Sequence, residues 1–361
     1  MTLLLTRSDI LAALNIPAAL DALRAGFVHS AAIEPLRIRT DLPGPGTATT
    51  LLPGLIPGIP AYTVKVNAKF PAASPALRGI VCLHDLTDGT LLAVMDSTTI
   101  TSWRTGLAAA LATDLLARPE ASPDAAEAGT AGAGVEAGAG IGAGAGIGAG
   151  AGVGAGVGAG AGFGAGVGAA RAGVVGVIGA GVQAAMVVAG LAALRGVGRL
   201  VVHDVDPERA IRFLAQQGIP GSVANSPQEV AAQTDVVVLA TWSREALLTL
   251  ADARPGLHLT TLGADEPGKV ELSADLLDAA RVVVDDRRLA VEMGALGNVG
   301  LSNDEVSATL TEVLTGVAPG RRTDDEVTVY APVGLPWQDL AIAWPVFQAA
   351  RGRGQVIDFL S

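Results

Sequence analysis

Aromatic residues, cysteine and histidine are all scarce in this chain of 361 residues. Phe, Trp and Tyr together make up 3% of it, so the core must be built mainly from Ala, Val, Leu and Gly. The single cysteine, Cys82, excludes an intrachain disulfide and a cysteine-rich zinc site, and it suits a reducing cytoplasmic compartment. The four histidines form no HxH or HxxxH pair, so no metal site is predicted.

Positive charge is also in deficit. The formal net charge of −11 argues against an extended nucleic-acid-binding surface. At the N-terminus, the apolar run of MTLLLTRSDI meets Arg7 and Asp9 before a signal core could form. Residues 137–170 carry no charge, but glycine is so frequent there that a membrane helix is not expected. We therefore expect neither a nucleic-acid partner nor a membrane segment.

The first third of the chain is typical of an α+β domain. The spacing of apolar residues predicts a helix over 7–30, which Ser8 can cap. Strand-like runs follow at 61–68, 79–85 and 91–96, and then a helix at 100–117. A Gly/Ala repeat comes next, and its composition indicates a low-complexity linker, because Ala and Gly bury too little surface to offset the entropy lost on ordering.

Strands and helices alternate from residue 173 onward, which predicts a doubly wound parallel sheet. Helices are then expected at 302–315 and 337–351, with a strand in EVTVYAPVG between them. That strand does not extend the parallel sheet naturally, so we expect this tail to return to the first domain. The predicted domains are therefore 1–120 plus 300–361, a linker at 121–170, and a nucleotide domain at 171–299.

The segment VVGVIGAGVQA, residues 174–184, has the order of a dinucleotide-binding site. Gly179 permits a tight turn after a strand, and Gly181 permits close approach of backbone to a pyrophosphate at a helix N-terminus. Asp204 follows the next strand, at the distance expected for an acid that binds ribose hydroxyls. Its charge would repel a 2′-phosphate and so favours NAD over NADP. The residues that this pattern assigns to the cofactor are Gly179, Ala180, Gly181, Val182, Gln183 and Asp204.

The Gly/Ala repeat matches the same glycine pattern many times, but no strand precedes those matches and no acid follows them. Softer candidates for the cofactor site are Thr105 with Gly106, at the start of a helix, and Thr241, which follows the apolar strand VVVLA. Thr241 could equally cap the segment that follows it.

Several segments together resemble the ornithine cyclodeaminase/mu-crystallin family. They occur in the family's order and cover most of the chain outside the repeat: EPLRIRT, TVKVNAKFP, GTLLAVMDSTTITSWRTG, IGAGVQA, GADEPGKVEL and VTVYAPVGLPWQDLA. The resemblance implies a Rossmann domain inserted in a discontinuous α+β domain that binds substrate and forms a homodimer. The long repeat departs from the family pattern, in which only a few residues link the two segments.

The resemblance also implies that Arg37, Lys65 and Arg104 bind a substrate carboxylate. Fixed cations suit that task, because arginine grips a carboxylate through two parallel hydrogen bonds and lysine adds a point charge. Each residue has another interpretation: Lys65 could be solvated in an edge strand, Arg104 could pair with Asp96, and Arg39 competes with Arg37. Lys69 is interpreted as a surface charge.

The matching position for the acid/base is Asp265, at the end of the strand GLHLTTLGAD, where ligands of open α/β sheets bind. Its carboxylate would attract the substrate amine, and partial burial would raise its pKa into a useful range. The alternative is an Asp that opens the turn before Pro267 and Gly268. Asp265 and Lys65 are the catalytic candidates, while Lys269 and Glu271 are assigned to the turn and the next helix. Val333 and Gly334 resemble a segment near the substrate, and Trp337 and Asp339 are interpreted equally as core and cap.

These features predict an NAD-dependent enzyme, lyase or oxidoreductase, that acts on a small amino or imino acid. In ornithine cyclodeamination, hydride passes from Cα to NAD, the distal amine closes on the imine with loss of ammonia, and hydride returns to give proline. A distal ammonium needs a second acidic group, and the segment between Arg37 and Lys65 offers only Asp41. The alternatives are a net amino-acid dehydrogenase of the alanine type, a reductase of cyclic ketimines such as pyrroline-2-carboxylate, and a non-catalytic nucleotide binder.

Overall fold

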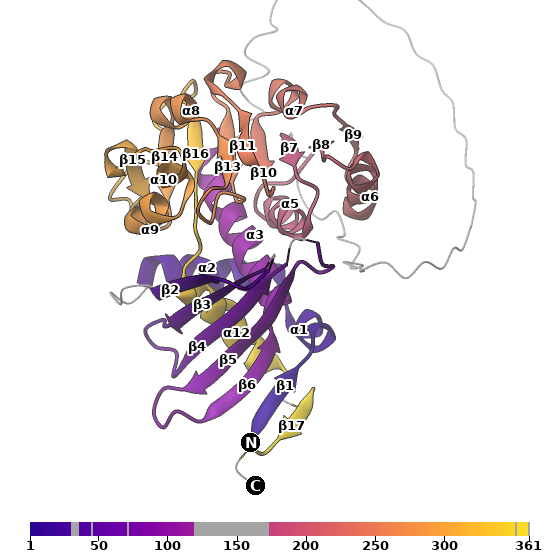
Figure 1. Ribbon diagram of the computed structural model, residues 1–361, viewed down its shortest axis with the longest axis vertical. Helices are drawn as coiled ribbons and strands as arrows, with labels where there is room; N and C mark the ends of the chain where they lie inside the picture. The colour runs from indigo at the N-terminus through magenta and orange to yellow at the C-terminus, as the bar shows by residue number, and fades with distance from the viewer. Residues whose placement is uncertain (30–35, 45, 71, 119–172, 351, 360–361) are drawn as a thin grey trace, which may run out of the picture. The chain divides into compact units, whose positions relative to one another are not determined.

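The computed structural model describes residues 1–29, 36–44, 46–70, 72–118, 173–350 and 352–359. The predicted linker at 121–170 lies outside the described residues. The fold is α/β, with a Rossmann-type parallel sheet inserted in a discontinuous α+β domain (Figure 1). The insertion falls between helix α3 (Ser97–Leu116) and helix α12 (Pro336–Ala349).

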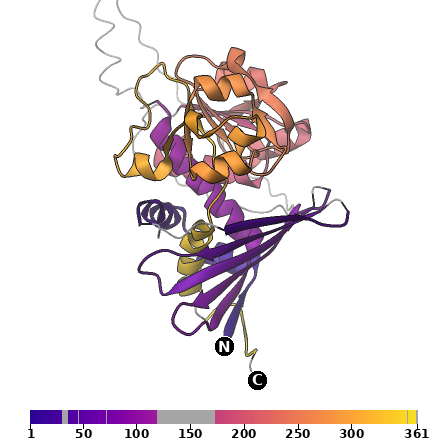
Figure 2. The ribbon, with the colours of Figure 1, turned by 60° about the vertical axis from the view of Figure 1, so that its left-hand side comes forward.

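The α+β part is a mixed sheet of seven strands. Its strands in spatial order are β17 (Gln355–Ile357), β1 (Thr2–Leu5), β6 (Leu91–Asp96), β5 (Leu77–Asp85), β4 (Ala61–Lys69), β3 (Thr47–Gly54) and β2 (Leu36–Asp41). Helices α2 (Ile16–His29), α3 and α12 cover one face of this sheet, as Figure 2 shows. The predicted strands and the helix after them are confirmed in this region.

The predicted helix over 7–30 is interrupted. Helix α1 (Arg7–Ala13) ends at Leu14, and α2 begins at Ile16. Thr6, rather than Ser8, caps α1: its hydroxyl accepts the Asp9 N–H, while the Asp9 carboxylate accepts the Thr6 N–H. Asn15 accepts the Ala18 N–H at 3.1 Å and so restarts the helix just before Pro17.

The inserted part is a parallel sheet of eight strands. In spatial order they are β9 (Gly221–Val223), β8 (Arg199–His203), β7 (Val174–Ile178), β10 (Val236–Leu239), β12 (His258–Thr261), β16 (Thr328–Tyr330), β14 (Arg281–Val284) and β15 (Val306–Thr309). Strands β7, β10, β12 and β14 are almost entirely buried, and all but β12 (HLTT) are mainly apolar, which is the pattern of parallel strands covered on both faces. The direction of winding reverses between β7 and β10.

Short helices connect and cover these strands, and two further strands form a small separate sheet. The helices are α5 (Val182–Leu194), α6 (Pro207–Gln217), α7 (Pro227–Gln233), α8 (Ala274–Ala279), α9 (Arg287–Glu292), α10 (Ala295–Asn298), α11 (Leu310–Leu314), η1 (Leu250–Asp252) and η2 (Asn303–Glu305). The small sheet pairs β11 (Arg244–Leu248) with β13 (Val270–Leu272).

Two sequence-based expectations about the tail are wrong. The strand in EVTVYAPVG does extend the parallel sheet, since β16 lies between β12 and β14. The segment 302–315 is not one helix, because its middle forms strand β15. This strand pairs with β14 and includes the β-branched residues Val306 and Thr309. The chain therefore leaves the parallel sheet after β16 and not near residue 300.

Helix α3 packs closely on α5 through small residues. A Cβ added at Gly106 would lie 2.3 Å from the Met186 Cβ, and one added at Gly190 would lie 2.5 Å from the Ala110 Cβ. These glycines therefore allow the two helix backbones to approach. Gly106 thus has a packing role, and a Cβ there would also lie 3.0 Å from the Gln183 carbonyl oxygen in the first turn of α5.

No single helix among the described residues is long and apolar enough to cross a membrane. Two helices, Arg7–Ala13 and Ile16–His29, meet the requirement only when counted together, and they are bent by 87° at their junction.

Candidate active site

The candidate site lies at the carboxyl edge of the parallel sheet. The segments that follow β7, β10, β12 and β16 all emerge at this edge and contain most of the residues singled out from the sequence. The edge is also where the winding direction reverses, between β7 and β10. Open α/β sheets bind their ligands in the crevice at this point, because the loops on either side diverge there.

The turn after β7 is shaped for close contact with a ligand. Gly179 has a φ of +93°, and a Cβ there would lie 2.6 Å from the Ala240 carbonyl oxygen. Gly181 is exposed, and a Cβ there would meet no atom within 4 Å. It is also the N-cap of α5 and makes no side-chain cap hydrogen bond, so the first N–H groups of the helix keep their capacity for an anion. Val182 beside it is 57% exposed.

Asp204 connects this turn to the end of β8. One carboxylate oxygen accepts the Ala180 N–H at 2.8 Å, and the other accepts the Asp206 N–H at 2.9 Å. The exposed Arg209 approaches the same carboxylate at 3.7 Å. Asp204 is thus a fixed negative charge at the edge of the glycine turn, the position expected for contact with ribose hydroxyls.

The two threonine candidates differ in the state of their hydroxyl groups. The Thr105 hydroxyl is buried and has no hydrogen-bond partner among the described residues. The Thr241 hydroxyl donates to Glu271 at 2.7 Å, and the Thr241 N–H donates to the same oxygen. The Thr105 hydroxyl is therefore free to form a hydrogen bond with a ligand, whereas the Thr241 hydroxyl already bonds Glu271. Together with the glycine turn and the uncapped helix, the orphaned hydroxyl fits the pyrophosphate of a dinucleotide.

Strand register places four cations on one face of the seven-stranded sheet. Arg37, Leu51 and Lys65 are direct cross-strand neighbours, so Arg37 and Lys65 project from the same face. Arg39 and Lys69 follow at even spacing along the same strands and share that face. The prediction that Val64 and Val66 point the other way from Lys65 follows from the same alternation.

Lys65 is buried in a central strand and is not solvated at an edge. Its side chain is 1% exposed, and its ammonium lies 2.8 Å from the carboxylate of Asp339, whose side chain is also 1% exposed. Arg104 reaches the same carboxylate, with its Nε 3.6 Å from Oδ1. Burial lowers the pKa of Lys65 to about 7, although Asp339 opposes that shift. Arg104 thus shares Asp339 with Lys65 rather than pairing with Asp96, which caps α3.

Three cations surround Asp265. Lys69 and Lys269 each donate to its carboxylate at 3.0 Å, and Arg37 approaches it at 3.4 Å. Burial favours a higher pKa, but the charges of Lys69, Lys269 and Arg37 hold the pKa of Asp265 well below its usual value. The expectation of a raised pKa is therefore wrong, because the three cations that converge on this carboxylate come from segments far apart in the sequence. Asp265 is an anion in this site.

Glu266 is a second buried carboxylate that the sequence reading missed. Its carboxylate contacts the Lys69 ammonium at 2.5 Å and the Lys269 ammonium at 3.5 Å. Arg39 lies 4.0 Å from it and also pairs with Asp41 at 2.7 Å. The interpretation of Lys69 as a surface charge is wrong. Lys269 does close the turn, since its N–H donates to the Glu266 carbonyl at 3.3 Å, and its side chain also reaches the site. The helix expected after the turn is wrong, because Glu271 lies in strand β13 (Val270–Leu272). Lys69 was detectable, because it stands four residues after Lys65 in a strand and so shares its face.

All three lysines of the chain are therefore in this site. Trp242 stands beside two of them. The Lys269 ammonium is 4.3 Å from the centre of its ring, and the Lys69 ammonium is 5.9 Å away. Trp242 is half exposed, and its ring lies beside the two lysines that contact Asp265, on the side of the loop after β10.

Two polar side chains, the half-buried Asn298 and the buried Glu271, hold the loop that carries Asp265. Asn298 accepts the Gly268 N–H at 3.0 Å and donates to the carbonyls of Glu266 and Lys269. Glu271, in β13, accepts hydrogen bonds from Thr241 and also from the Thr261 hydroxyl and the Gly263 N–H, at 2.7 and 2.8 Å. Burial raises the pKa of Glu271. Glu271 thus joins the ends of β10 and β12, a role that its sequence position did not indicate.

The segment after β16, which contains Val333 and Gly334, lies against Arg37 and Arg104. The Val333 carbonyl accepts from Arg37 at 2.6 Å. A Cβ at Gly334, whose φ is +95°, would lie 2.1 Å from Arg104 Nη1, so only glycine leaves room for that guanidinium. Trp337 belongs to the core and packs edge-on against Phe27 at 4.7 Å. Its neighbour Asp339 belongs to the site.

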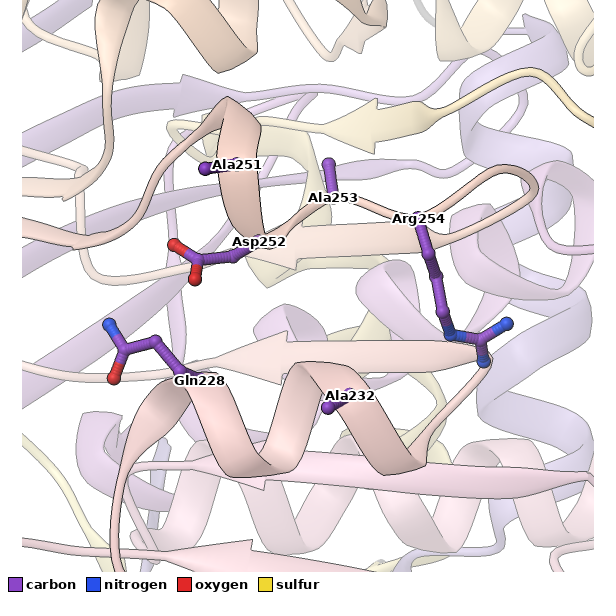
Figure 3. Close-up of a pocket in the computed structure, with 6 residues that line it drawn as sticks. All are labelled: Gln228, Ala232, Ala251, Asp252, Ala253 and Arg254. Atoms are coloured by element: carbon purple, nitrogen blue, oxygen red, sulfur yellow. The ribbon is translucent and has the colours of Figure 1, made fainter.

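A separate surface pocket of about 410 Å³ has no link to this chemistry. Figure 3 shows its lining, with Gln228 on α7 near Asp252 and with Arg254 at the other end. These side chains already have partners: Gln228 donates to the Leu247 carbonyl, and Arg254 pairs with Asp235. Elsewhere in the described ranges, no three His, Cys, Asp or Glu side chains are grouped to hold a metal ion.

Comparison with known proteins agrees with this geometry. A sequence model of the ornithine cyclodeaminase/mu-crystallin family matches residues 2–143 and 157–354. The chain belongs to this family. A family relative, the alanine dehydrogenase of Archaeoglobus fulgidus, is 30% identical over 284 residues, which are 76% of this chain and 71% of that protein.

Two further members are similar over nearly the whole chain. The Δ1-pyrroline-2-carboxylate reductase of Bacillus cereus is 24% identical and covers 89% of both proteins. The structure of an archaeal alanine dehydrogenase dimer with bound NAD superposes with a TM-score of 0.79, at 25% identity and with 99% of both chains covered. The family prediction and the fold prediction made from the sequence are thereby confirmed.

Proposed function

We propose that the protein is an NAD-dependent oxidoreductase that interconverts a small α-amino acid and the corresponding α-imino acid. The observation that carries this proposal is the pair of opposed groups at the carboxyl edge: the cations Arg37, Lys65 and Arg104, and the anionic Asp265. A zwitterion has one anionic and one cationic end, so it complements such a pair.

The glycine turn, Asp204 and Thr105 would hold the dinucleotide. NAD supplies a two-electron acceptor, so an amino acid that loses its Cα–H as hydride, together with one N–H proton, becomes an imino acid. Arg37, Lys65 and Arg104 would bind the carboxylate and fix the orientation of Cα. Asp265, held ionised, would stabilise the positive charge of the iminium. Lys65, with a pKa of about 7, can accept or return a proton near neutral pH.

Net redox chemistry is favoured over cyclodeamination by the state of the site's carboxylates. Asp265 and Glu266 are paired with lysines, Asp339 with Lys65, and Asp41 with Arg39. Asp265 is assigned to the α-nitrogen of the substrate, so a distal ammonium, as in ornithine, would need a further carboxylate, and Glu266, Asp339 and Asp41 are each paired with a cation of the protein. The names of the relatives include net oxidoreductases and an ornithine cyclodeaminase, so the preference for net redox chemistry is based on the carboxylates alone. Conversion of ornithine to proline stays a prediction from the sequence.

A substrate panel tests the proposal. Purified protein is assayed with L-alanine, L-proline and L-ornithine in the presence of NAD or NADP, and with pyrroline-2-carboxylate or pyruvate plus ammonia in the presence of NADH. We expect net formation or consumption of NADH and a preference for NAD over NADP. Ammonia release from ornithine without net NADH would establish cyclodeamination instead. Retention of NAD with no turnover of any substrate would establish a binding protein.

We also propose that the protein is a homodimer in the cytoplasm. The sheet face opposite the helices carries a row of exposed apolar side chains on neighbouring strands: Ile38, Val66 and Ile80 are 51, 46 and 44% exposed. Val66 and Ile80 are direct cross-strand neighbours, and Thr50 of β3 separates them from Ile38. Exposed apolar side chains gathered on one sheet face are typical of an interface. The similar archaeal structure is a dimer.

The dimer is tested by Val66→Asp, which places a charge in the middle of that row. We expect a dimer mass for the wild type by light scattering and a monomer mass for the variant. The control is Leu86→Asp, because Leu86 is 54% exposed in the turn after β5. A monomeric wild type, or a variant that stays dimeric, would exclude this face as the interface.

A further inference from the structure

Asp339 stands between two cations that come from different parts of the chain. It lies in the first turn of α12, while Lys65 is in β4 and Arg104 is in α3. Its carboxylate is 2.8 Å from the Lys65 ammonium and 3.6 Å from Arg104 Nε. All three side chains are at most 8% exposed.

We propose that Asp339 is a positioning residue that holds Lys65 and Arg104 together as a single carboxylate-binding pair. This inference rests on the proposed function and deepens it. Two buried cations repel each other and lose hydration, so their side chains have no reason to converge without a shared anion. Asp339 supplies that anion from a fully buried helix start, where it cannot swing away when substrate binds.

A second contact from the same segment supports this arrangement. The Gln338 side-chain oxygen accepts from Arg104 Nη1 at 3.0 Å and from the Leu335 N–H at 3.2 Å. The start of α12 therefore presents a hydrogen-bond acceptor, the Gln338 oxygen, to Arg104 Nη1 and a carboxylate, that of Asp339, within ion-pair distance of Arg104 Nε. Gly334, which has no Cβ, leaves room for the same guanidinium.

The charge balance leaves the pair ready for one more anion. Arg37 already faces Asp265, so the pair itself is Lys65 and Arg104. With Lys65 protonated these two side chains carry two positive charges, and Asp339 neutralises one of them. Asp285 is the other nearby acid. Burial raises its pKa, and its oxygens accept the N–H groups of Val333 and Gly334. A substrate carboxylate would reduce the remaining positive surplus, whereas a neutral group would not.

Removal of the Asp339 charge should lower the pKa of Lys65. The groups that face Lys65 are Asp339 from α12, Arg104 and Thr101 from α3, and Arg37 from β2. Burial, Arg104 and Arg37 lower the pKa of Lys65, and Asp339 is the group that raises it. In Asp339→Asn the pKa of Lys65 therefore falls below about 7, and the lysine is largely neutral at neutral pH.

Lysine NMR measures this effect directly and without turnover. Protein labelled with ¹³C at the lysine ε-carbon gives signals from the three lysines alone, and Lys65→Arg identifies the signal of Lys65. We expect Lys65 to titrate near pH 7 in the wild type, at lower pH in Asp339→Asn, and near the wild-type value in Asp339→Glu. An unchanged Lys65 titration in Asp339→Asn would overturn the proposal.

Kinetics supply the second readout. At neutral pH we expect Asp339→Asn to raise KM for the amino or imino acid at least about tenfold, the effect of a change of one pKa unit, with a smaller change in kcat and an unchanged Kd for NADH. The alkaline limb of kcat/KM should move to lower pH. The control is Asp325→Asn, because Asp325 is 86% exposed and its ion pair is with Arg118, which is not one of the site residues.

Different measurements test the proposed function and the role of Asp339. If the wild type turns over no substrate, the proposed function fails, while the Lys65 titration still decides the role of Asp339. If the wild type is active and Asp339→Asn lowers kcat equally at every pH without changing KM, Asp339 has only a structural role.

Discussion

Asp265→Asn is expected to lower kcat for the preferred amino or imino acid by about 10²–10³-fold, with NADH binding retained. The substitution keeps the shape of the side chain and removes its charge. Loss of one fixed electrostatic partner of the reacting group costs about 3–4 kcal/mol of transition-state stabilisation in comparable sites. The effect should be large because Asp265 stays ionised under the charges of Lys69, Lys269 and Arg37.

The pH profile separates this role from acid/base catalysis. Since the pKa of Asp265 is held well below its usual value, the group remains charged through the whole range from weakly acidic to alkaline pH. The wild type should therefore show no acidic limb from Asp265 above about pH 5, well above the usual pKa of an aspartate. The control is Asp21→Asn on the exposed side of α2. A variant that retains more than about a tenth of wild-type kcat would contradict the assignment, since that loss is about 1.4 kcal/mol.

Alanine substitutions at Gly179 and Gly181 are expected to act in opposite ways. Gly179→Ala should destabilise the protein without any cofactor, because its φ of +93° is strained for alanine and its Cβ would lie 2.6 Å from the Ala240 oxygen. Such strain costs of the order of 1–3 kcal/mol. Gly181→Ala should leave the stability nearly unchanged, since its Cβ meets no atom within 4 Å.

For NADH affinity the expectation differs from that for stability, because the substitution at Gly181 should have a large effect. If backbone at Gly181 touches the pyrophosphate, an added Cβ occupies that space and should weaken binding at least about tenfold, or 1.4 kcal/mol. Thermal unfolding and NADH titration of the two variants, measured in parallel, give both quantities. A Gly181→Ala protein that binds NADH as tightly as the wild type would place the cofactor elsewhere.

Local features of the sequence were sufficient for much of the site. The glycine turn depends on a short strand, two glycines and a helix within about ten residues of chain, so its geometry is set by neighbours. The shared face of Arg37 and Lys65 follows from the alternation of side chains along strands. Applied to Lys69, the same rule would have placed it in the site instead of on the surface.

Two errors arose where distant segments compete for one sheet. Strand β16 reads as an isolated apolar run, and only its pairing with β12 and β14 makes it part of the parallel sheet. Strand β15 was read as helix because its four residues are too short to show a period of two. In both cases the pairing partner decided the outcome.

The sequence by itself determined the family, the dinucleotide turn and the residue types needed to bind an α-amino acid. Only the tertiary structure decided which charges meet. Arg37 and Asp265 are 228 residues apart and Lys65 and Asp339 are 274 apart, yet each pair is in contact. The physical reason is that burial and Coulomb interaction depend on distance in space, so the low pKa of Asp265, the shifted pKa of Lys65 and the role of Asp339 exist only once the strands and helices have packed.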